Sequence, residues 1–234
     1  MTPSTYTWSG GTETLLRFGP STGPLLVVAM PLFEEANRTR TFVVTILRTL
    51  GERGIASALP DLPGIGDSLV ATEHVSLSNW ENAFSAAALP SADHPTVHGL
   101  GIRGGTLFDG KAILASRYQF APTPGANLIR DLLRTRLAAA KEDGERFDPD
   151  ILSPGPPIQL AGNTLNRQLV ADLSAAIPAR TGPIRTARLA TDTQPAEIKF
   201  AAAPLWRRAE PDNDPALAAL IADDIAAWIA TCAA

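Results

Sequence analysis

A glycine-rich loop after a predicted strand contains the residues best placed to do chemistry. The strand expected over residues 96–100 leads into Gly101-Ile102-Arg103-Gly104-Gly105, and a short helix is expected from Gly104 to Asp109. This is the frame of a nucleophile elbow, in which glycines allow a tight turn and the middle side chain projects into a pocket. The middle residue is Arg103, whose protonated guanidinium cannot act as a nucleophile. The plainer interpretation is an ordinary strand–helix turn, because short glycine motifs are weak signals.

The histidines argue against a Ser–His–acid triad built on this elbow. In the chain order of such hydrolases, the histidine follows the nucleophile and the acid. The last histidine is His98, which precedes Arg103. We interpret His98 as packed or paired inside its strand, and His74 and His94 as solvated loop residues. A triad in this order is therefore excluded.

Two more loops are expected beside the elbow, because ligands bind at the carboxyl ends of strands in open α/β sheets. One loop runs from Pro31 to Arg38, and the other from Gly64 to Ser68. In the second loop Ser68 is the nearest hydroxyl, with Asp67 beside it. A structural turn is the favoured interpretation. The alternative is a hydrolase with a non-standard site, in which another partner would replace histidine in activating Ser68.

Hydrophobic patterning predicts the strands and helices that would position these loops. Short apolar runs alternate with helical periodicity after an N-terminal hairpin at residues 5–18. This pattern predicts a three-layer α/β/α sandwich around a mostly parallel sheet, with an antiparallel start. Strands are expected at 24–30, 55–59, 96–100, 111–118, 158–161, 184–189 and 198–201. Helices are expected at 38–53, 77–88 and 127–142, after a cap at Asn163, and from Asp214-Pro215 to about Ile229.

Composition limits the classes of function. The 234 residues have 20 Lys and Arg against 24 Asp and Glu, a net charge of −4, so nucleic acid is not an expected partner. The single cysteine and three histidines predict no metal site, and we expect no cofactor. No apolar run reaches about 18 residues and no signal peptide is visible, so we expect no membrane span and a cytoplasmic location. We expect one domain over residues 1–234, with a small lid-like helical segment around 122–157.

Several motifs together resemble the α/β-hydrolase superfamily. Within it, the chain is most similar to the type 2 hydrolase-like family associated with the exosortase A (PEP-CTERM) system of Gram-negative bacteria. The resemblance implies a hydrolase-like fold with arginine at the elbow and a role in exosortase or exopolysaccharide biology. The matching segments, in family order, are PLFEEANRTR (31–40), LPDLPGIGDS (59–68), GLGIRGG (99–105), PTPGANLIRDLLRTRLAA (122–139), LAGNTLNRQL (160–169) and PLWRR (204–208).

In this frame the Pro31–Arg38 loop lies beside Arg103. A buried guanidinium needs an anionic partner, so we predict that Glu34 or Glu35 pairs with Arg103. Two uses of the site compete. Either the pair fills the former pocket of a non-catalytic binding or scaffold protein, or Arg103 and its neighbours hold an anionic ligand. The candidate pocket residues are Phe33, Glu34, Glu35, Arg38, Arg103 and Gly104.

The predicted helix over 127–142 has leucines at helical spacing, which are typical of core. Its arginines Arg130, Arg134 and Arg136 are interpreted as a solvated face. Because the helix falls where hydrolases carry a lid, a contact with a protein partner or a homodimer is an open alternative. Trp206 is expected near the usual place of the triad histidine, either as an aromatic plug or simply packed on the last helix.

Overall fold

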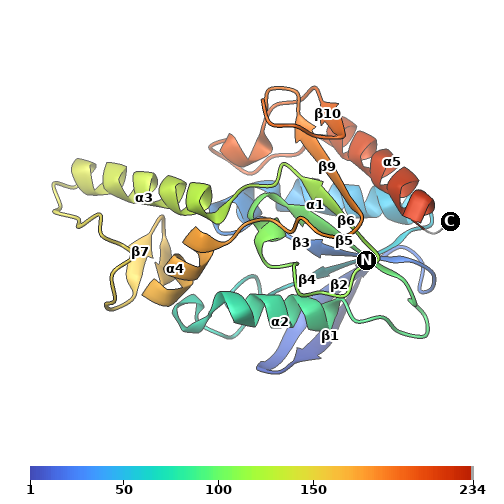
Figure 1. Ribbon diagram of the computed structural model, residues 1–234, viewed down its shortest axis with the longest axis horizontal. Coiled ribbons are helices and arrows are strands. Elements are labelled where there is room, and N and C mark those ends of the chain that lie inside the picture. Colours follow the sequence, from blue (N-terminus) through green and yellow to red (C-terminus); the bar gives the residue numbers. More distant parts are fainter. Residues whose placement is uncertain (233–234) are drawn as a thin grey trace.

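An eight-stranded sheet forms the centre of the structure, a computed structural model that describes residues 1–232 (Figure 1). Its strand order is β1-β2-β4-β3-β5-β6-β9-β10. The N-terminal hairpin and the β2–β4 pair are antiparallel, and the other five pairs are parallel. The predicted fold class is therefore confirmed. The strands are β1 (Thr2–Trp8), β2 (Gly11–Phe18), β3 (Leu25–Ala29), β4 (Ala56–Pro60), β5 (Val97–Ile102), β6 (Ser116–Phe120), β9 (Ile184–Leu189) and β10 (Ile198–Phe200).

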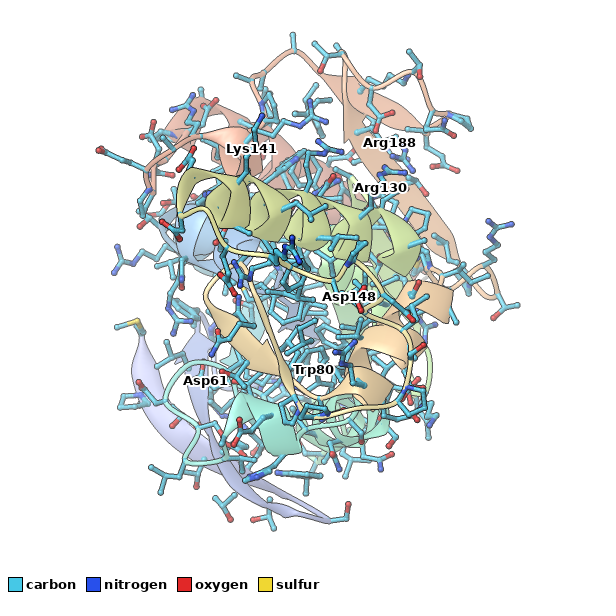
Figure 2. All side chains as sticks on the ribbon, turned by 90° about the vertical axis from the view of Figure 1, so that its left-hand side faces the viewer. Asp61, Trp80, Arg130, Lys141, Asp148 and Arg188 are labelled. Atoms are coloured by element: carbon cyan, nitrogen blue, oxygen red, sulfur yellow. The ribbon has the colours of Figure 1, made fainter. Side chains whose placement is uncertain are left out.

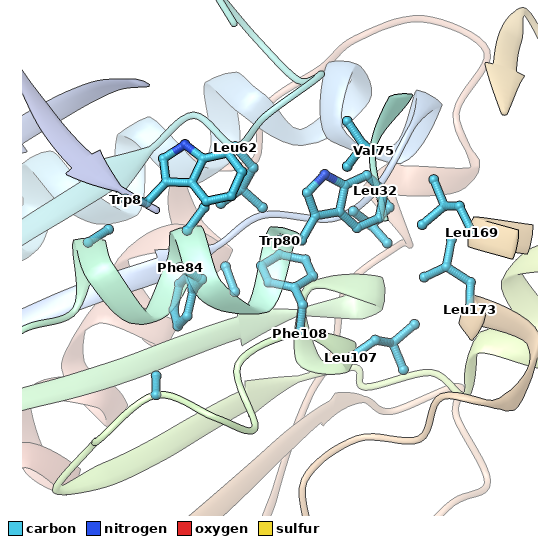
Figure 3. Close-up of a cluster of buried hydrophobic side chains, with 14 of the residues drawn as sticks. Trp8, Leu32, Leu62, Val75, Trp80, Phe84, Leu107, Phe108, Leu169 and Leu173 are labelled. Atoms are coloured by element: carbon cyan, nitrogen blue, oxygen red, sulfur yellow. The ribbon is translucent and has the colours of Figure 1, made fainter. Parts of the chain in front are cut away.

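Helices cover both faces of the sheet, which is why β3 and β5 are buried along their whole length. On one face, α1 (Glu34–Glu52) and α5 (Pro215–Cys232) pack over an apolar cluster that includes Phe42 and Ile221. On the other face, α2 (Leu77–Ala87) packs through Trp80 and Phe84 against Phe108 (Figure 3). The two clusters give the three expected layers.

A separate group of elements projects from one end of the sheet (Figure 1). It comprises α3 (Gly125–Glu142), the small hairpin of β7 (Ile158–Leu160) and β8 (Asn163–Leu165), and α4 (Arg167–Ala175). The predicted strand at 158–161 therefore exists, but it pairs only with β8. The cap of α4 is Asn166, not Asn163, because the Asn166 side chain accepts a hydrogen bond from the Leu169 amide at 2.7 Å.

Two other boundaries differ from the sequence prediction by four or five residues. Strand β6 begins at Ser116, not at Lys111, because the Arg117 guanidinium holds the preceding residues in a loop. It donates to the carbonyls of Asp109 and Ala112 at 3.1 and 3.0 Å. Helix α1 begins at Glu34, four residues earlier than predicted, and so places two acidic residues in its first turn.

Three short 3₁₀ helices complete the described elements: η1 (Thr72–His74), η2 (Arg103–Leu107) and η3 (Leu205–Arg207). Among residues 1–232, α5 alone is long and apolar enough to cross a membrane by length and composition. Its side chains Ile221, Ile225 and Ile229 are buried against the sheet face. The helix therefore packs on the sheet through one face, and a third of its residues are buried.

Candidate functional site at the carboxyl edge of the sheet

The elbow lies at the end of β5, where Arg103 adopts a φ of 54°. This left-handed conformation is uncommon for a residue with a side chain and marks a constrained turn. Gly105 lets the turn sit close to β3, because a Cβ there would lie 2.1 Å from the Ala29 carbonyl oxygen. The turn continues into η2, a 3₁₀ helix of five residues. The helix expected from Gly104 to Asp109 is therefore a short 3₁₀ segment, and so short a helix has little dipole.

Arg103 is joined to Glu35, the second residue of α1. Its Nη2 donates to Glu35 Oε1 at 2.9 Å, and its Nε lies 3.2 and 3.3 Å from the two carboxylate oxygens. Each of the two side chains is 16% exposed. Of the two carboxylates predicted to pair with Arg103, the structure selects Glu35. This charge-assisted contact neutralises the guanidinium at the place of a nucleophile.

Trp206 covers the other side of the same guanidinium. The Arg103 Cζ atom lies 4.8 Å from the centroid of the indole ring, and Trp206 is in turn edge-on to Phe120. Arg38 fixes this arrangement, because its guanidinium donates to the Trp206 carbonyl at 3.2 Å and to Glu34 at 3.3 Å. The tryptophan thus lies against the elbow as an aromatic plug would.

Two open cavities of about 590 and 530 Å³ meet at this edge, and we call them together the edge groove. Both are lined by Arg103, Arg130, Asp131 and Arg207. Each volume falls within the range typical of small-molecule sites, roughly 300–1,000 Å³. Arg103 therefore lies at the junction of two spaces, each large enough for a metabolite.

The two cavities differ in the residues of their linings, although both expose more polar than apolar surface. The lining of the first includes apolar residues from the Pro31–Arg38 loop, α3 and η3, namely Leu32, Phe33, Leu128, Leu132 and Trp206. The second is walled mainly by polar groups and prolines, among them Gln119, Thr123, Asn127 and Thr186.

Arginine dominates the charge of the edge groove. Its four carboxylates each have an arginine partner, in the pairs Arg38–Glu34, Arg103–Glu35, Arg134–Asp131 and Arg188–Asp192. Three further arginines in the lining, Arg130, Arg180 and Arg207, have no acidic partner among the described residues. Arg130 and Arg188, from α3 and β9, lie on the same side of α3 (Figure 2). The groove is therefore positive in a protein whose net charge is −4.

Sequence reasoning missed most of this cluster. Arg130 and Arg134 were predicted on a solvated helix face, and both are exposed, although they also line the first cavity. The same prediction is wrong for Arg136, whose side chain is 17% exposed and paired with Glu145. Arg180, Arg188 and Arg207 were not singled out. They come from segments that are distant in sequence, and no local pattern indicates that the fold brings them together.

The alternative nucleophile has no activating partner. Ser68 Oγ accepts a hydrogen bond from the Val70 amide at 3.2 Å, and Ser68 lines neither cavity of the edge groove. The Asp67 amide donates to Asp61 at 3.2 Å, which ties the Gly64–Ser68 segment into a turn. Burial raises the pKa of Asp61, and the Asp67 amide and Arg40 oppose this shift. The geometry is that of the structural turn.

None of the three histidines lines the edge groove. His98 Nδ1 lies 2.8 Å from Ser116 Oγ, but both residues are 1% exposed at the opposite end of β5 and β6, so the pair cannot meet a substrate. Burial lowers the pKa of His98. His94 was expected to be solvated, which is wrong: it is buried, and its Nδ1 lies 3.0 Å from the Gly23 carbonyl.

A smaller cavity of about 250 Å³ also opens beside the elbow. It is lined by Arg103 at the elbow, Asp192 after β9 and Trp206 in η3. The carboxylate of Asp192 is held by Arg188 at 2.7 Å. A serine nucleophile and a histidine base are thus missing from this lining, whereas an acidic residue is present.

Comparison with known proteins supports the same frame. No family model matches the chain, and no curated protein sequence matches it. Solved structures do match over almost the whole chain. Ferulic-acid-bound Est1E from Butyrivibrio proteoclasticus is 17% identical with a TM-score of 0.63, covering 97% of this chain and 98% of that one. The chain has the α/β-hydrolase fold.

Two further structures with this fold are equally complete matches. Mouse α/β-hydrolase domain-containing protein 10 is 14% identical with a TM-score of 0.61, covering 99% of both chains. The epoxide hydrolase VrEH1 from Vigna radiata is 11% identical with a TM-score of 0.59, covering 98% of both chains. At these identities the likeness establishes the α/β-hydrolase fold, and function has to be argued from the site itself.

Proposed function

We propose that this α/β-hydrolase-fold protein binds an anionic small molecule in the edge groove and does not hydrolyse esters through a Ser–His–acid triad. The observation that carries the proposal is Arg103 at the elbow, paired with Glu35 and stacked on Trp206, at the junction of two open cavities. Arginine at this position leaves the elbow without a nucleophile. The unpaired arginines around it leave a positive groove that attracts an anion.

The biological setting we propose is that of an accessory protein of exosortase or exopolysaccharide systems, acting in the cytoplasm. Its support is the ordered set of motifs from residues 31 to 208, including the arginine at the elbow. A protein partner or a second copy of this chain remains a further candidate occupant of the surface formed by α3.

Calorimetric titration with citrate and with inorganic phosphate tests the binding proposal. We expect both anions to bind the wild-type protein, and binding to weaken between 50 and 200 mM salt, because exposed charges are screened. Arg207→Gln should reduce the affinity several-fold. Arg17→Gln, which changes an exposed arginine outside the edge groove, should leave it unchanged. If neither anion binds, the proposal fails.

Ester turnover tests the absence of triad chemistry. p-Nitrophenyl acetate and octanoate should be hydrolysed no faster by the wild-type protein than by Ser68→Ala, because Ser68 has no base and lies outside the groove. The hydrolase alternative would instead be supported by turnover that Ser68→Ala abolishes and Arg207→Gln leaves intact.

A further inference from the structure

The three unpaired arginines of the edge groove converge from separate parts of the chain. Arg130 lies on α3, Arg180 on the loop between α4 and β9, and Arg207 on η3, and all three line the second cavity. Arginines that only formed a solvated face would all lie on one helix or strand. Here three separate segments each contribute an arginine to the lining of one cavity, while every carboxylate of the groove is already engaged.

The number of free donors selects the chemistry of the anion. One guanidinium can satisfy both oxygens of a carboxylate through a bidentate contact. Three guanidinium groups exceed that need, and they match a group with more oxygens and more charge. A phosphate monoester has about −1.5 to −2 charges at pH 7 and three terminal oxygens. Arginine is also the residue best suited to bidentate phosphate recognition.

The lining of the first cavity indicates the chemistry of the rest of the ligand. Arg130 and Arg207 line both cavities, so a phosphoryl group held between them lies next to the first cavity as well. The lining of that cavity includes Leu128, Leu132 and Trp206, and the small exposed part of each offers apolar contact to the substituent of an ester.

We infer that the ligand of the edge groove is a phosphate monoester with an apolar body. Its phosphoryl group lies between Arg130, Arg180 and Arg207, and its body lies along Leu128, Leu132 and Trp206. The inference rests on the proposed function, since it names the chemical class of the anion that the groove binds. The Arg103–Glu35 pair then borders the ligand without being needed to hold it.

Calorimetric titration of the full chain with four probes tests this inference. The probes are octyl phosphate below its micelle concentration, butyl phosphate, octanoate and inorganic phosphate. We expect octyl phosphate to bind at least tenfold more tightly than octanoate, and more tightly than butyl phosphate or inorganic phosphate. The double variant Arg130→Gln/Arg207→Gln should lose at least tenfold in affinity for octyl phosphate. Both arginines are exposed, so the variant should fold, and Arg17→Gln serves as the matched control.

The outcomes separate this inference from the proposed function. If octanoate binds as tightly as octyl phosphate, or the double variant binds like wild type, the phosphate-ester inference fails while anion binding stands. If none of the four probes binds, the proposed function fails with it. Sedimentation with vesicles that contain phosphatidic acid identifies the source when octyl phosphate does bind. Co-sedimentation supports a lipid headgroup, and its absence supports a soluble ester.

Discussion

Arg103 is a charged side chain on a turn whose conformation disfavours side chains. Its φ of 54° costs of order 1–3 kcal/mol, so surrounding contacts must hold it in place. Glu35, the Trp206 ring and the Ala121 carbonyl provide those contacts. At the scale of single residues, the site is therefore a constrained cation whose charge is cancelled by one carboxylate.

Glu35→Gln tests the balance between stability and binding. Glutamine keeps the shape of the side chain but removes the charge that Arg103 faces. We expect the free energy of unfolding to fall by about 1–3 kcal/mol, since hydrogen bonds to charged groups contribute that much. We also expect anion affinity to rise several-fold, because Arg103 becomes a further free cation in the groove. Urea unfolding and phosphate titration measure the two effects.

Glu34→Gln is the matched control for that experiment. Glu34 pairs with Arg38 on the same helix, and its side chain is 39% exposed, so its loss should change stability by less than about 1 kcal/mol. A fall in anion affinity on Glu35→Gln would contradict the prediction. It would show that Glu35 positions Arg103 for the ligand and does not compete with it.

At the scale of elements, the elbow depends on how closely η2 approaches β3. A Cβ on Gly105 would meet the Ala29 carbonyl oxygen at 2.1 Å, and backbone cannot move aside as a side-chain end can. Gly105→Ala should therefore lower the free energy of unfolding by about 1–3 kcal/mol or more. Gly110→Ala, whose Cβ would meet no atom within 4 Å, should be nearly neutral. Equal stability of the two variants in thermal unfolding would contradict this close packing.

The elements were mostly predictable, because their signals are local. The apolar run of β3, the capping box at Ser76 and the Asp214-Pro215 start of α5 each fix an element from neighbouring residues. The misplaced start of β6 has a long-range cause. Arg117 inside the strand binds carbonyls of the preceding loop, and hydrophobic patterning cannot detect such a contact.

The same distinction holds for the candidate site. The Arg103–Glu35 pair was within reach of sequence reasoning, because the elbow frame places two named loops side by side. The cluster of Arg130, Arg180 and Arg207 was not, since its members have no shared motif and meet only through the tertiary fold. The sequence allowed the prediction of an anionic ligand. It did not allow a prediction of how many arginines line the groove.

At the scale of the whole molecule, charge is distributed unevenly. The protein has a net charge of −4, yet the edge groove has three arginines beyond its ion pairs. Such a local positive field raises the association rate of anions and falls with ionic strength. The acidic remainder of the surface disfavours nonspecific binding of polyanions such as nucleic acid. The uneven distribution thus favours small anions that can enter the groove.

The stability of the whole fold should also depend on pH through one buried carboxyl group, Asp109. It is fully buried, and burial raises its pKa from 3.8 to about 6 despite Arg117 Nε at 3.6 Å. Between pH 4 and 6 the folded state therefore binds more protons at this group than the unfolded state does. Because of this difference, the contribution of Asp109 to stability falls as pH rises through that window.

The variant Asp109→Asn has no titratable group at this position, so its comparison with the wild type isolates the contribution of Asp109 to the pH dependence of stability. The wild-type free energy of unfolding, minus that of the variant, should decrease by about 2 kcal/mol from pH 4 to pH 7, at 1.36 kcal/mol for each pKa unit. Urea unfolding of both proteins across this range measures the difference. A constant offset between them is also expected, because an amide replaces a carboxyl group at a buried position. A difference that stays flat or increases with pH would contradict the raised pKa, and would place a charged Asp109 in a well-compensated ion pair.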